Sequence, residues 1–353
     1  MRILVTGGYG FIGGCLIRKL LLETSNIVFN IDKLSYASDS KKIHTLPSKL
    51  LSDRYFFEKV DLADNASTYK AVKKSDPDLV MHLAAESHVD RSIESPFDFV
   101  QSNVVGTFNL LEAVKDHWKS LPKIRKNKFK FHHISTDEVF GTLDEVGKFD
   151  ETSAYDPRSP YSATKASSDH FVRAWHHTYG LPTLITNCSN NYGPWQFPEK
   201  LIPNVILKAI ANLPIPIYGD GANMRDWLYI EDHISALILV AMQGEIGKTY
   251  CIGGGAEKSN LEVANEICNC LKQLKPQEKS YESLISFVED RPGHDYRYSI
   301  DATNINNVLG WKPDHTFNEA IMKTVKWYIK NLDWCQSLMD KAGHEGQRIG
   351  LGK

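Results

Sequence analysis

The sequence has little excess of charge of either sign and no long apolar run. Its 353 residues carry 41 Lys and Arg against 43 Asp and Glu, which gives a formal net charge of -2. Proteins that bind the phosphate backbone of nucleic acids usually have a strong basic excess, so the composition argues against that kind of partner. No stretch reaches the roughly 18 apolar residues of a membrane-spanning helix. We therefore expect neither nucleic acid nor a membrane as a partner.

Cysteine is also scarce, and its spacing is not that of a metal or redox motif. There are six cysteines, and the one close pair, Cys268 and Cys270, has a C-x-C spacing. Common zinc sites and thioredoxin-like motifs use other spacings, so buried free thiols are expected and no metal site is predicted. The first residues run directly into a glycine-rich turn, so we expect no signal peptide and a cytoplasmic protein.

Short apolar runs alternate with amphipathic stretches through the first half of the chain. This alternation predicts an α/β fold, with a Rossmann-type doubly wound parallel sheet buried by helices on both faces. The segment 119–130 is interpreted as a basic, solvated loop. Strands are expected at 3–6, 27–31, 55–60, 79–83, 129–135 and 183–187, and helices at 10–22, 66–74, 97–119 and 161–179.

The pattern changes after residue 187, where Pro and Gly become frequent and the predicted elements become shorter. We expect a Rossmann domain over 1–187 and a smaller α/β substrate domain over 188–353, with some segments of the second returning to the first. The Gly-rich tail from Ala342 is expected to fray. In the second part, a strand is expected at 215–218 and helices at 201–212, 230–242, 260–274 and 316–329.

A glycine-rich segment, residues 7–13, follows the first predicted strand and opens the first helix. Glycines allow a tight turn and a close approach to a pyrophosphate, while the helix N-terminus offers free N–H groups. A tight turn alone could require the same glycines, but the strand–turn–helix context favours a dinucleotide site. Asp32 ends the second strand, where its carboxylate could accept ribose hydroxyls and repel a 2′-phosphate. NAD is therefore favoured over NADP, with a turn cap as the other reading of Asp32.

Two groups of residues suggest acid–base chemistry. Tyr161 and Lys165 are four residues apart on a predicted helix, so a lysine charge should favour the phenolate of an otherwise weak base. An exposed chance pair is the alternative. Thr136, Asp137 and Glu138 follow a strand at the edge where parallel sheets bind ligands. One carboxyl could stay protonated as an acid and the other ionised as a base, the alternative being a solvated acidic turn.

The sequence resembles the extended short-chain dehydrogenases/reductases over nearly the whole chain. The glycine motif and the Y-x-x-x-K motif mark that superfamily, and the Thr-Asp-Glu triplet resembles its nucleotide-sugar 4,6-dehydratase branch. Tyr9, Gly14 and Phe140 depart from the usual pattern. The other segments that carry the resemblance are 82–92, 134–139, 187–194, 197–203, 225–229 and 290–294.

The resemblance implies a lyase that uses NAD to convert a nucleoside-diphosphate-glucose to its 4-keto-6-deoxy sugar. Tyr161 would take the 4-hydroxyl proton as C4 passes hydride to NAD, and Thr136 would polarise that oxygen. Glu138 would remove the C5 proton, Asp137 would protonate the departing C6 hydroxyl, and the hydride would return to C6. Thymidine is favoured as the base by resemblance only, with uridine next. A 4-epimerase and a non-catalytic NAD-sensing protein remain the alternatives.

The resemblance also implies a homodimer through the helices at 97–119 and 161–179, and it implies the ligand contacts. Cations among them fit a diphosphate, which needs converging positive charges. The implied cofactor-binding residues are Gly7, Gly10, Phe11, Ile12, Gly13, Asp32, Lys33, Leu34, Ser35, Asp61, Leu62, Leu83, Ala84, Ala85, Ser87, Ser102, Tyr161, Lys165 and Asn191. The implied substrate-binding residues are Ser87, Thr136, Asn190, Lys200, Leu201, Pro216, Ile217, Tyr218, Arg225, Asn260, Asp290, Arg291 and His294.

Overall fold

A seven-stranded, fully parallel sheet forms the centre of the computed structural model, which describes residues 1–290 and 292–342. The strand order β10-β6-β5-β4-β1-β2-β3 changes direction between β1 and β4, as in a doubly wound sheet. The predicted Rossmann-type fold is confirmed. The strands are β1 (Arg2–Thr6), β2 (Ile27–Asp32), β3 (Tyr55–Lys59), β4 (Leu79–His82), β5 (Lys130–Thr136), β6 (Thr183–Cys188) and β10 (Thr249–Ile252).

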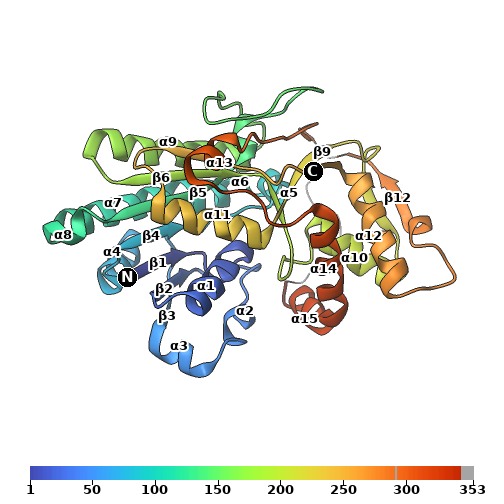
Figure 1. Cartoon of the computed structure of the whole chain (residues 1–353), viewed down its shortest axis with the longest axis horizontal. Helices are drawn as coiled ribbons and strands as arrows, with labels where there is room; N and C mark the ends of the chain where they lie inside the picture. The colour runs from blue at the N-terminus through green and yellow to red at the C-terminus, as the bar shows by residue number, and fades with distance from the viewer. Residues whose placement is uncertain (291, 343–353) are drawn as a thin grey trace.

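Helices cover both faces of this sheet (Figure 1). Successive strand residues point to opposite faces, so Ile3 and Val5 join one buried cluster while Leu4 joins another. The first face is covered by α1 (Phe11–Glu23) and α11 (Ile230–Gln243), which pack against each other. The second face is covered by α4 (Asn65–Ser75), α7 (Gly106–Ser120) and α9 (Pro160–Tyr179).

Two local predictions about the second face are wrong. The single helix expected at 97–119 is divided into α6 (Pro96–Phe99), a π-helical turn η1 (Val100–Val105) and α7. The π turn ends at Gly106, where a Cβ would lie 3.1 Å from Leu62 Cβ, so the chain passes unusually close to its neighbour there. The loop expected at 119–130 contains the short helix α8 (Lys123–Lys126), in which Arg125 forms ion pairs with Asp76 and Asp78.

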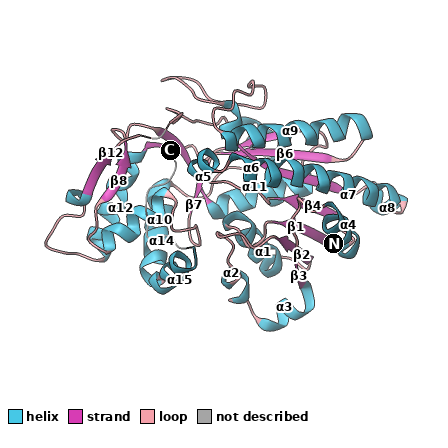
Figure 2. Ribbon diagram, turned by 180° about the vertical axis from the view of Figure 1, so that it is seen from behind, coloured by secondary structure: helices cyan, strands magenta, loops and turns pink. Residues whose placement is uncertain are grey.

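The chain after residue 187 forms a smaller group of elements at the end of the molecule far from α8 (Figures 1 and 2). Its three-stranded sheet has the order β11-β9-β7, and β8 pairs with β12 in parallel. Strand β10 and helix α11 also come after residue 187 but lie on the large sheet. The expected fraying tail lies outside the described residues beyond 342.

The remaining elements complete this outline. They are α2 (Lys41–His44), α3 (Ser48–Arg54), α5 (Val89–Glu94), η2 (Asp137–Phe140), β7 (Asn190–Tyr192), α10 (Leu201–Ile210), β8 (Ile215–Tyr218), β9 (Met224–Tyr229), β11 (Glu257–Ser259), α12 (Asn260–Leu274), η3 (Glu282–Leu284), β12 (Ile285–Val288), α13 (Thr303–Leu309), α14 (Phe317–Lys330) and α15 (Leu332–Ala342). Among the described residues, no helix is long and apolar enough to cross a membrane.

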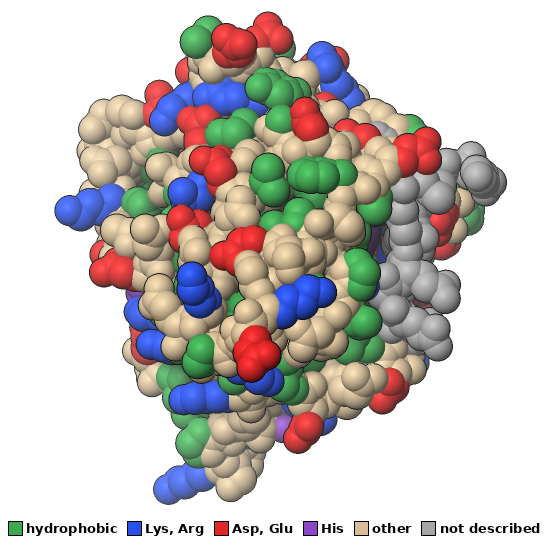
Figure 3. Space-filling model, turned by 90° about the vertical axis from the view of Figure 1, so that its right-hand side faces the viewer, with side chains coloured by type: hydrophobic (Ala, Val, Ile, Leu, Met, Phe, Trp, Pro, Cys, Tyr) green, Lys and Arg blue, Asp and Glu red, His purple; other side chains and the backbone are tan. Residues whose placement is uncertain are grey.

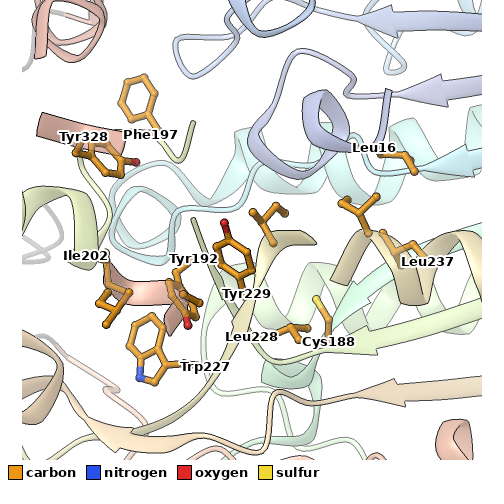
Figure 4. Packing of buried hydrophobic residues seen from close by; sticks show 14 of the residues in the cluster. Leu16, Cys188, Tyr192, Phe197, Ile202, Trp227, Leu228, Tyr229, Leu237 and Tyr328 are labelled. Atoms are coloured by element: carbon orange, nitrogen blue, oxygen red, sulfur yellow. The ribbon is translucent and has the colours of Figure 1, made fainter. Parts of the chain in front are cut away.

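One buried hydrophobic cluster joins the two groups of elements. It runs from Leu16 and Leu237, beneath the large sheet, to Trp227 and Tyr328 in the smaller part (Figure 4). Burial of this continuous apolar surface stabilises the arrangement in which the edge of the sheet faces the smaller part. On the face shown in Figure 3, acidic, basic and hydrophobic side chains are interspersed.

Candidate active site

One cleft follows the carboxyl ends of strands in the large sheet and contains all five predicted catalytic residues: Thr136, Asp137, Glu138, Tyr161 and Lys165. Leu34 is the one predicted cofactor residue that does not line it; this side chain is 42% exposed. The predicted cofactor residues that line the cleft are Gly7, Gly10, Phe11, Ile12, Gly13, Asp32, Lys33, Ser35, Asp61, Leu62, Leu83, Ala84, Ala85, Ser87, Ser102, Tyr161, Lys165 and Asn191.

The turn between β1 and α1 has the shape that a dinucleotide needs. Gly7 has a positive φ of 70°, and a Cβ there would lie 2.7 Å from Ala84 Cα. A Cβ on Gly13 would lie 2.3 Å from Gly7 O. Any side chain at either position would disrupt this turn, whereas glycine leaves the backbone and the N-terminus of α1 accessible to a pyrophosphate.

Asp32 organises the loop that follows β2. One carboxylate oxygen accepts hydrogen bonds from Leu34 N and Ser38 Oγ, both at 2.8 Å, and the other accepts from Tyr9 N at 3.0 Å. Beside it, the Lys33 ammonium contacts Glu86 Oε1 at 2.7 Å. The Asp32 carboxylate therefore stabilises this loop through hydrogen bonds and also forms part of the cleft wall.

Helix α9 places Tyr161 and Lys165 in the cleft. It begins at Pro160 behind a Ser159 capping box, in which the Ser159 and Ser162 side chains bond to each other's backbone N–H groups. Lys165 Nζ donates to Ile134 O at 2.9 Å. Burial and the Glu138 charge raise the pKa of Tyr161 well above its usual value, against a lowering hydrogen bond from Thr136. The prediction of a lowered tyrosine pKa is therefore wrong in this structure.

The acid pair occupies two different environments at the end of β5. Thr136 Oγ1 accepts a hydrogen bond from Glu138 N and so caps the short turn η2 that carries both carboxyls. Asp137 is 1% exposed, whereas Glu138 is half-buried. Burial, followed by the charges of Glu138 and Asp226, raises the pKa of Asp137 well above its usual value. A solvated acidic turn is therefore excluded for Asp137.

A buried carboxylate, Asp169, supports this site from one turn further along α9. Asp169 Oδ2 accepts hydrogen bonds from Ser135 Oγ at 2.9 Å, Tyr155 OH at 2.7 Å and Asn187 Nδ2 at 3.2 Å. Its other oxygen lies 3.1 Å from His133 Nε2. These contacts join α9 to the carboxyl ends of β5 and β6. The sequence carries no local signal for this residue, because its partners come from three separate segments: β5, the loop at Tyr155, and the end of β6.

The predicted substrate residues fall into two groups. Ser87, Asn190 and Lys200 line the cleft with Thr136. The side-chain amide oxygens of Asn190 and Asn191 are buried without a hydrogen-bond partner among the described residues. Other predicted residues lie in the smaller part and do not line the cleft, and Arg291 lies outside the described residues. Those that do not line it are Leu201, Pro216, Ile217, Tyr218, Arg225, Asn260, Asp290 and His294.

Two of the predicted cationic contacts are engaged with the protein itself. The Arg225 guanidinium donates to the carbonyl oxygens of Met224 and Asp295, and its charge partly offsets the rise in the pKa of Asp137. His294 Nδ1 lies 2.6 Å from Asp290 Oδ1. Arg225 therefore acts on the acid pair electrostatically and is not presented to the cleft as a free cation.

Several residues of the cleft were not among the predicted site residues, although some lie in segments that carry the family resemblance. Glu199 contacts Arg91 at 3.1 Å and accepts a hydrogen bond from Tyr36 OH at 2.8 Å, so residues far apart in the chain meet there. Among residues 1–290 and 292–342, no group of three His, Cys, Asp or Glu side chains is arranged to hold a metal ion. The unpredicted lining residues are Ile31, Tyr36, Ala37, Ser38, Lys42, Val60, Glu86, Ile134, Ser135, Cys188, Ser189, Gln196, Phe197 and Glu199.

The glycine turn on a parallel sheet, together with a tyrosine and a lysine one helical turn apart at its carboxyl edge, defines an extended short-chain dehydrogenase/reductase. More particularly, the chain belongs to the family described as GDP-mannose 4,6 dehydratase, whose model matches residues 4–324.

Proteins named dTDP-glucose 4,6-dehydratase are similar to the chain over its whole length. The one from Neisseria meningitidis serogroup B is 52% identical, with 100% of this chain and 99% of the relative covered. The one numbered 1 from Escherichia coli K12 is 52% identical, with 97% and 96% covered.

Solved structures of enzymes with two different activities share this fold. A dTDP-glucose 4,6-dehydratase from Streptomyces venezuelae, solved with NAD bound, has a TM-score of 0.86 and 39% identity, with 96% of this chain and 100% of that chain covered. A UDP-glucose 4-epimerase from Thermus thermophilus, also complexed with NAD, has a TM-score of 0.81 and 27% identity, with 93% and 99% covered. The fold alone therefore does not separate dehydration from epimerisation.

Proposed function

We propose that the protein is an NAD-dependent lyase that dehydrates dTDP-glucose to its 4-keto-6-deoxy sugar. The observation that carries this proposal is the acid pair, in which Asp137 is buried and Glu138 half-buried in the same cleft as Tyr161. The full-length relatives at 52% identity, all named for this activity, support the substrate. The dehydratase structure with NAD bound supports the cofactor.

The first step requires a base beside the sugar 4-hydroxyl. Bound NAD would supply a hydride acceptor for C4 and later a donor to C6. Tyr161 takes the hydroxyl proton, and Thr136 donates a hydrogen bond to the same oxygen. Lys165 holds α9 against β5 through Ile134 and contributes positive charge to the buried cleft. Thr136, Tyr161 and Lys165 all line the same cleft.

Elimination requires a base and an acid that differ in protonation. The 4-ketone acidifies the C5 proton, and Glu138, half-buried, is the carboxylate that removes it. Burial raises the pKa of Asp137 and favours its protonated form, which gives its proton to the C6 hydroxyl as that group leaves as water. When C6 would take the hydride back from the reduced cofactor, Glu138 returns a proton to C5. The two adjacent carboxyls thus have opposite tasks because their surroundings differ.

Substrate anchoring belongs to the same proposal. Lys200 lies on the cleft wall and its ammonium donates to Ser87 O at 3.2 Å, so it is placed to contact a diphosphate. Asn190 presents a buried amide oxygen to the same region. We assign NAD binding to residues 1–187 and nucleotide-sugar binding to 188–353, with thymidine as the base on the strength of the named relatives.

The decisive experiment is incubation of the purified protein with dTDP-glucose in deuterated water, without added NAD. A 4-keto-6-deoxy product with deuterium at C5 is expected by NMR and mass spectrometry. Conversion of UDP-glucose to UDP-galactose without any keto product would establish the epimerase instead. Binding of NAD with no turnover of any nucleotide sugar would establish the sensor.

We also propose that the protein forms a homodimer through α6, η1, α7 and α9. Phe97 is 68% exposed, Phe108 is 40% exposed and Tyr179 is 43% exposed on these helices. Exposed aromatic side chains on neighbouring helices are consistent with an interaction surface. A second copy presenting the same helices would bury them by two-fold symmetry. Light scattering should give twice the chain mass, and Phe108→Glu should shift it towards monomer; a monomeric wild-type peak would refute the dimer.

A cytoplasmic location is the last part of the proposal. All six cysteines are free and five of them are buried, which suits a reducing compartment. Cell fractionation should recover the activity with cytoplasmic markers, and recovery in a secreted fraction would contradict it.

A further inference from the structure

Lys42 lies directly behind the glycine-rich turn, in the short helix α2. Its side chain is 2% exposed and forms part of the cleft wall. The ammonium donates to Tyr9 O at 3.1 Å and to Gly10 O at 2.9 Å, so both hydrogen bonds are to backbone carbonyls and neither is to a carboxylate. Lysine is rarely buried in this way without an acidic partner, so the position requires an explanation.

Gly14 provides the space for this side chain. A Cβ at Gly14 would lie 2.9 Å from Lys42 Cδ, which is closer than non-bonded carbons normally approach. Glycine inside a helix costs about 1 kcal/mol relative to alanine, so α1 is weakened at this point. The two residues therefore form a matched pair beneath the turn.

The hydrogen bonds of Lys42 fix the direction in which the turn faces. Tyr9 O also accepts from Asp39 N at 3.0 Å, while Tyr9 N donates to Asp32 Oδ2. The carbonyl oxygens of Tyr9 and Gly10 are thereby held by the ammonium, and they are the groups that would repel a phosphate. The first N–H groups of α1, which have no intrahelical acceptor, remain for the anion.

The positive charge of Lys42 also favours an anionic ligand such as a pyrophosphate. Burial lowers the pKa of Lys42 to about 8, against the raising effects of Cys15, Asp39 and Asp32. The side chain is therefore largely protonated at neutral pH, and a buried cation of this kind is stabilised by a nearby anion. Asp39 and Asp32 provide part of that charge, and the first turn of α1 adds no acidic residue.

We propose that Lys42 is a positioning residue for the dinucleotide pyrophosphate, which orients the glycine turn and places a positive charge behind it so that NAD is retained. This proposal rests on the proposed NAD dependence. Absence of NAD from the wild-type protein would refute the NAD dependence, whereas unchanged NAD exchange in Lys42→Met would refute the role of Lys42. Lys42 acts through the turn and takes no part in the chemistry of the sugar.

The test compares Lys42→Met with Lys41→Met, the neighbouring exposed lysine, as a matched control. NAD is counted per chain in the purified proteins, and its exchange with isotopically labelled NAD is timed in the presence of ADP or adenosine. Lys42→Met should exchange NAD about tenfold faster, and ADP should compete about tenfold less well, as expected for loss of one charge interaction. Adenosine, which has no phosphate, should compete equally in both variants.

A second pair of variants tests the packing. Gly14→Ala should displace Lys42 and speed exchange in the wild-type background, but should add nothing in Lys42→Ala, where the clashing atom is gone. If Lys42→Met matches Lys41→Met, or if adenosine competition weakens as much as ADP competition, the role of Lys42 is refuted. If the wild-type protein neither contains nor takes up NAD, the proposed cofactor dependence fails and this inference fails with it.

Discussion

The Lys165 ammonium donates a 2.9 Å hydrogen bond to the carbonyl oxygen of Ile134, two residues before the strand ends at Thr136. This contact ties helix α9 to the strand that carries the acid pair. The base and the two carboxyls are thus held on adjoining elements of a rigid sheet edge. Tyr161 is meanwhile buried with a raised pKa, so its reactivity depends on what enters the cleft.

The first prediction concerns the Tyr161 hydroxyl. Tyr161→Phe removes the proposed base but leaves the ring and the cofactor turn in place. Turnover should fall by about 10²–10⁴-fold, the usual contribution of a general base, while NAD content per chain stays unchanged. Tyr179→Phe, at the exposed end of the same helix, should retain full activity in the same assay. Substantial turnover by Tyr161→Phe would remove it as the base.

Glu138→Gln should separate oxidation from elimination. Without a carboxylate to take the C5 proton, the reaction should stop after C4 oxidation, and the absorbance of reduced nicotinamide should accumulate in a stopped-flow trace. Exchange of the C5 proton with deuterated water should slow by about 10²–10⁴-fold. Glu145→Gln, on the exposed loop that follows, serves as the control. C5 exchange at the wild-type rate would contradict the assignment.

Asp137→Asn should slow water loss and change the pH dependence of stability. Burial raises the pKa of Asp137, so its folded form favours the protonated state. That contribution to stability is complete below the unfolded pKa and is lost as pH rises through the folded pKa. Asparagine cannot ionise, so the variant should melt at a higher temperature than wild type at neutral and alkaline pH, with the difference vanishing in acid. Equal melting temperatures across this range would show that the carboxyl is not strained by burial.

The elements most readily predicted from the sequence were those with a local cause. The glycine turn folds so tightly that a side chain on Gly13 would collide with the backbone of Gly7, and α9 begins where Ser159 and Pro160 provide a cap. The acid pair could be predicted because a strand end places its next residues in the cleft. Each of these signals lies within a few consecutive residues.

Other features could not be predicted because they depend on distant segments. Lys42 was not predicted, since the lysine contacts the glycine turn only after α2 folds back onto it. The raised pKa of Tyr161 follows from burial beside Glu138, which helical spacing to Lys165 does not describe. The break in the helix at η1 ends at Gly106, which packs closely against Leu62 from a distant segment. The spacing of residues in the sequence predicts which side chains are neighbours on one helix or strand. The pKa values of those side chains depend on burial and on residues from distant segments.

The last prediction concerns Asp169 as a positioning residue. Burial alone would raise the pKa of Asp169, but His133, Lys165 and Tyr155 together lower it, so the carboxylate is ionised at neutral pH. Its hydrogen bonds to Ser135 and Asn187 hold the strands beside the acid pair. Asp169→Asn keeps the shape but removes the charge and should cost about 3 kcal/mol of folding stability.

The pH dependence distinguishes this role from simple packing. A lowered folded pKa contributes stability that is present above the unfolded pKa and lost as pH falls through the folded pKa. The melting temperatures of wild type and Asp169→Asn should therefore differ at neutral pH and converge in acid, and the pH profile of kcat should shift because the charge near Lys165 changes. Tyr155→Phe, which removes one donor to Asp169 and no charge, should leave that profile in place. If the two variants share the wild-type kcat profile, Asp169 acts through packing alone.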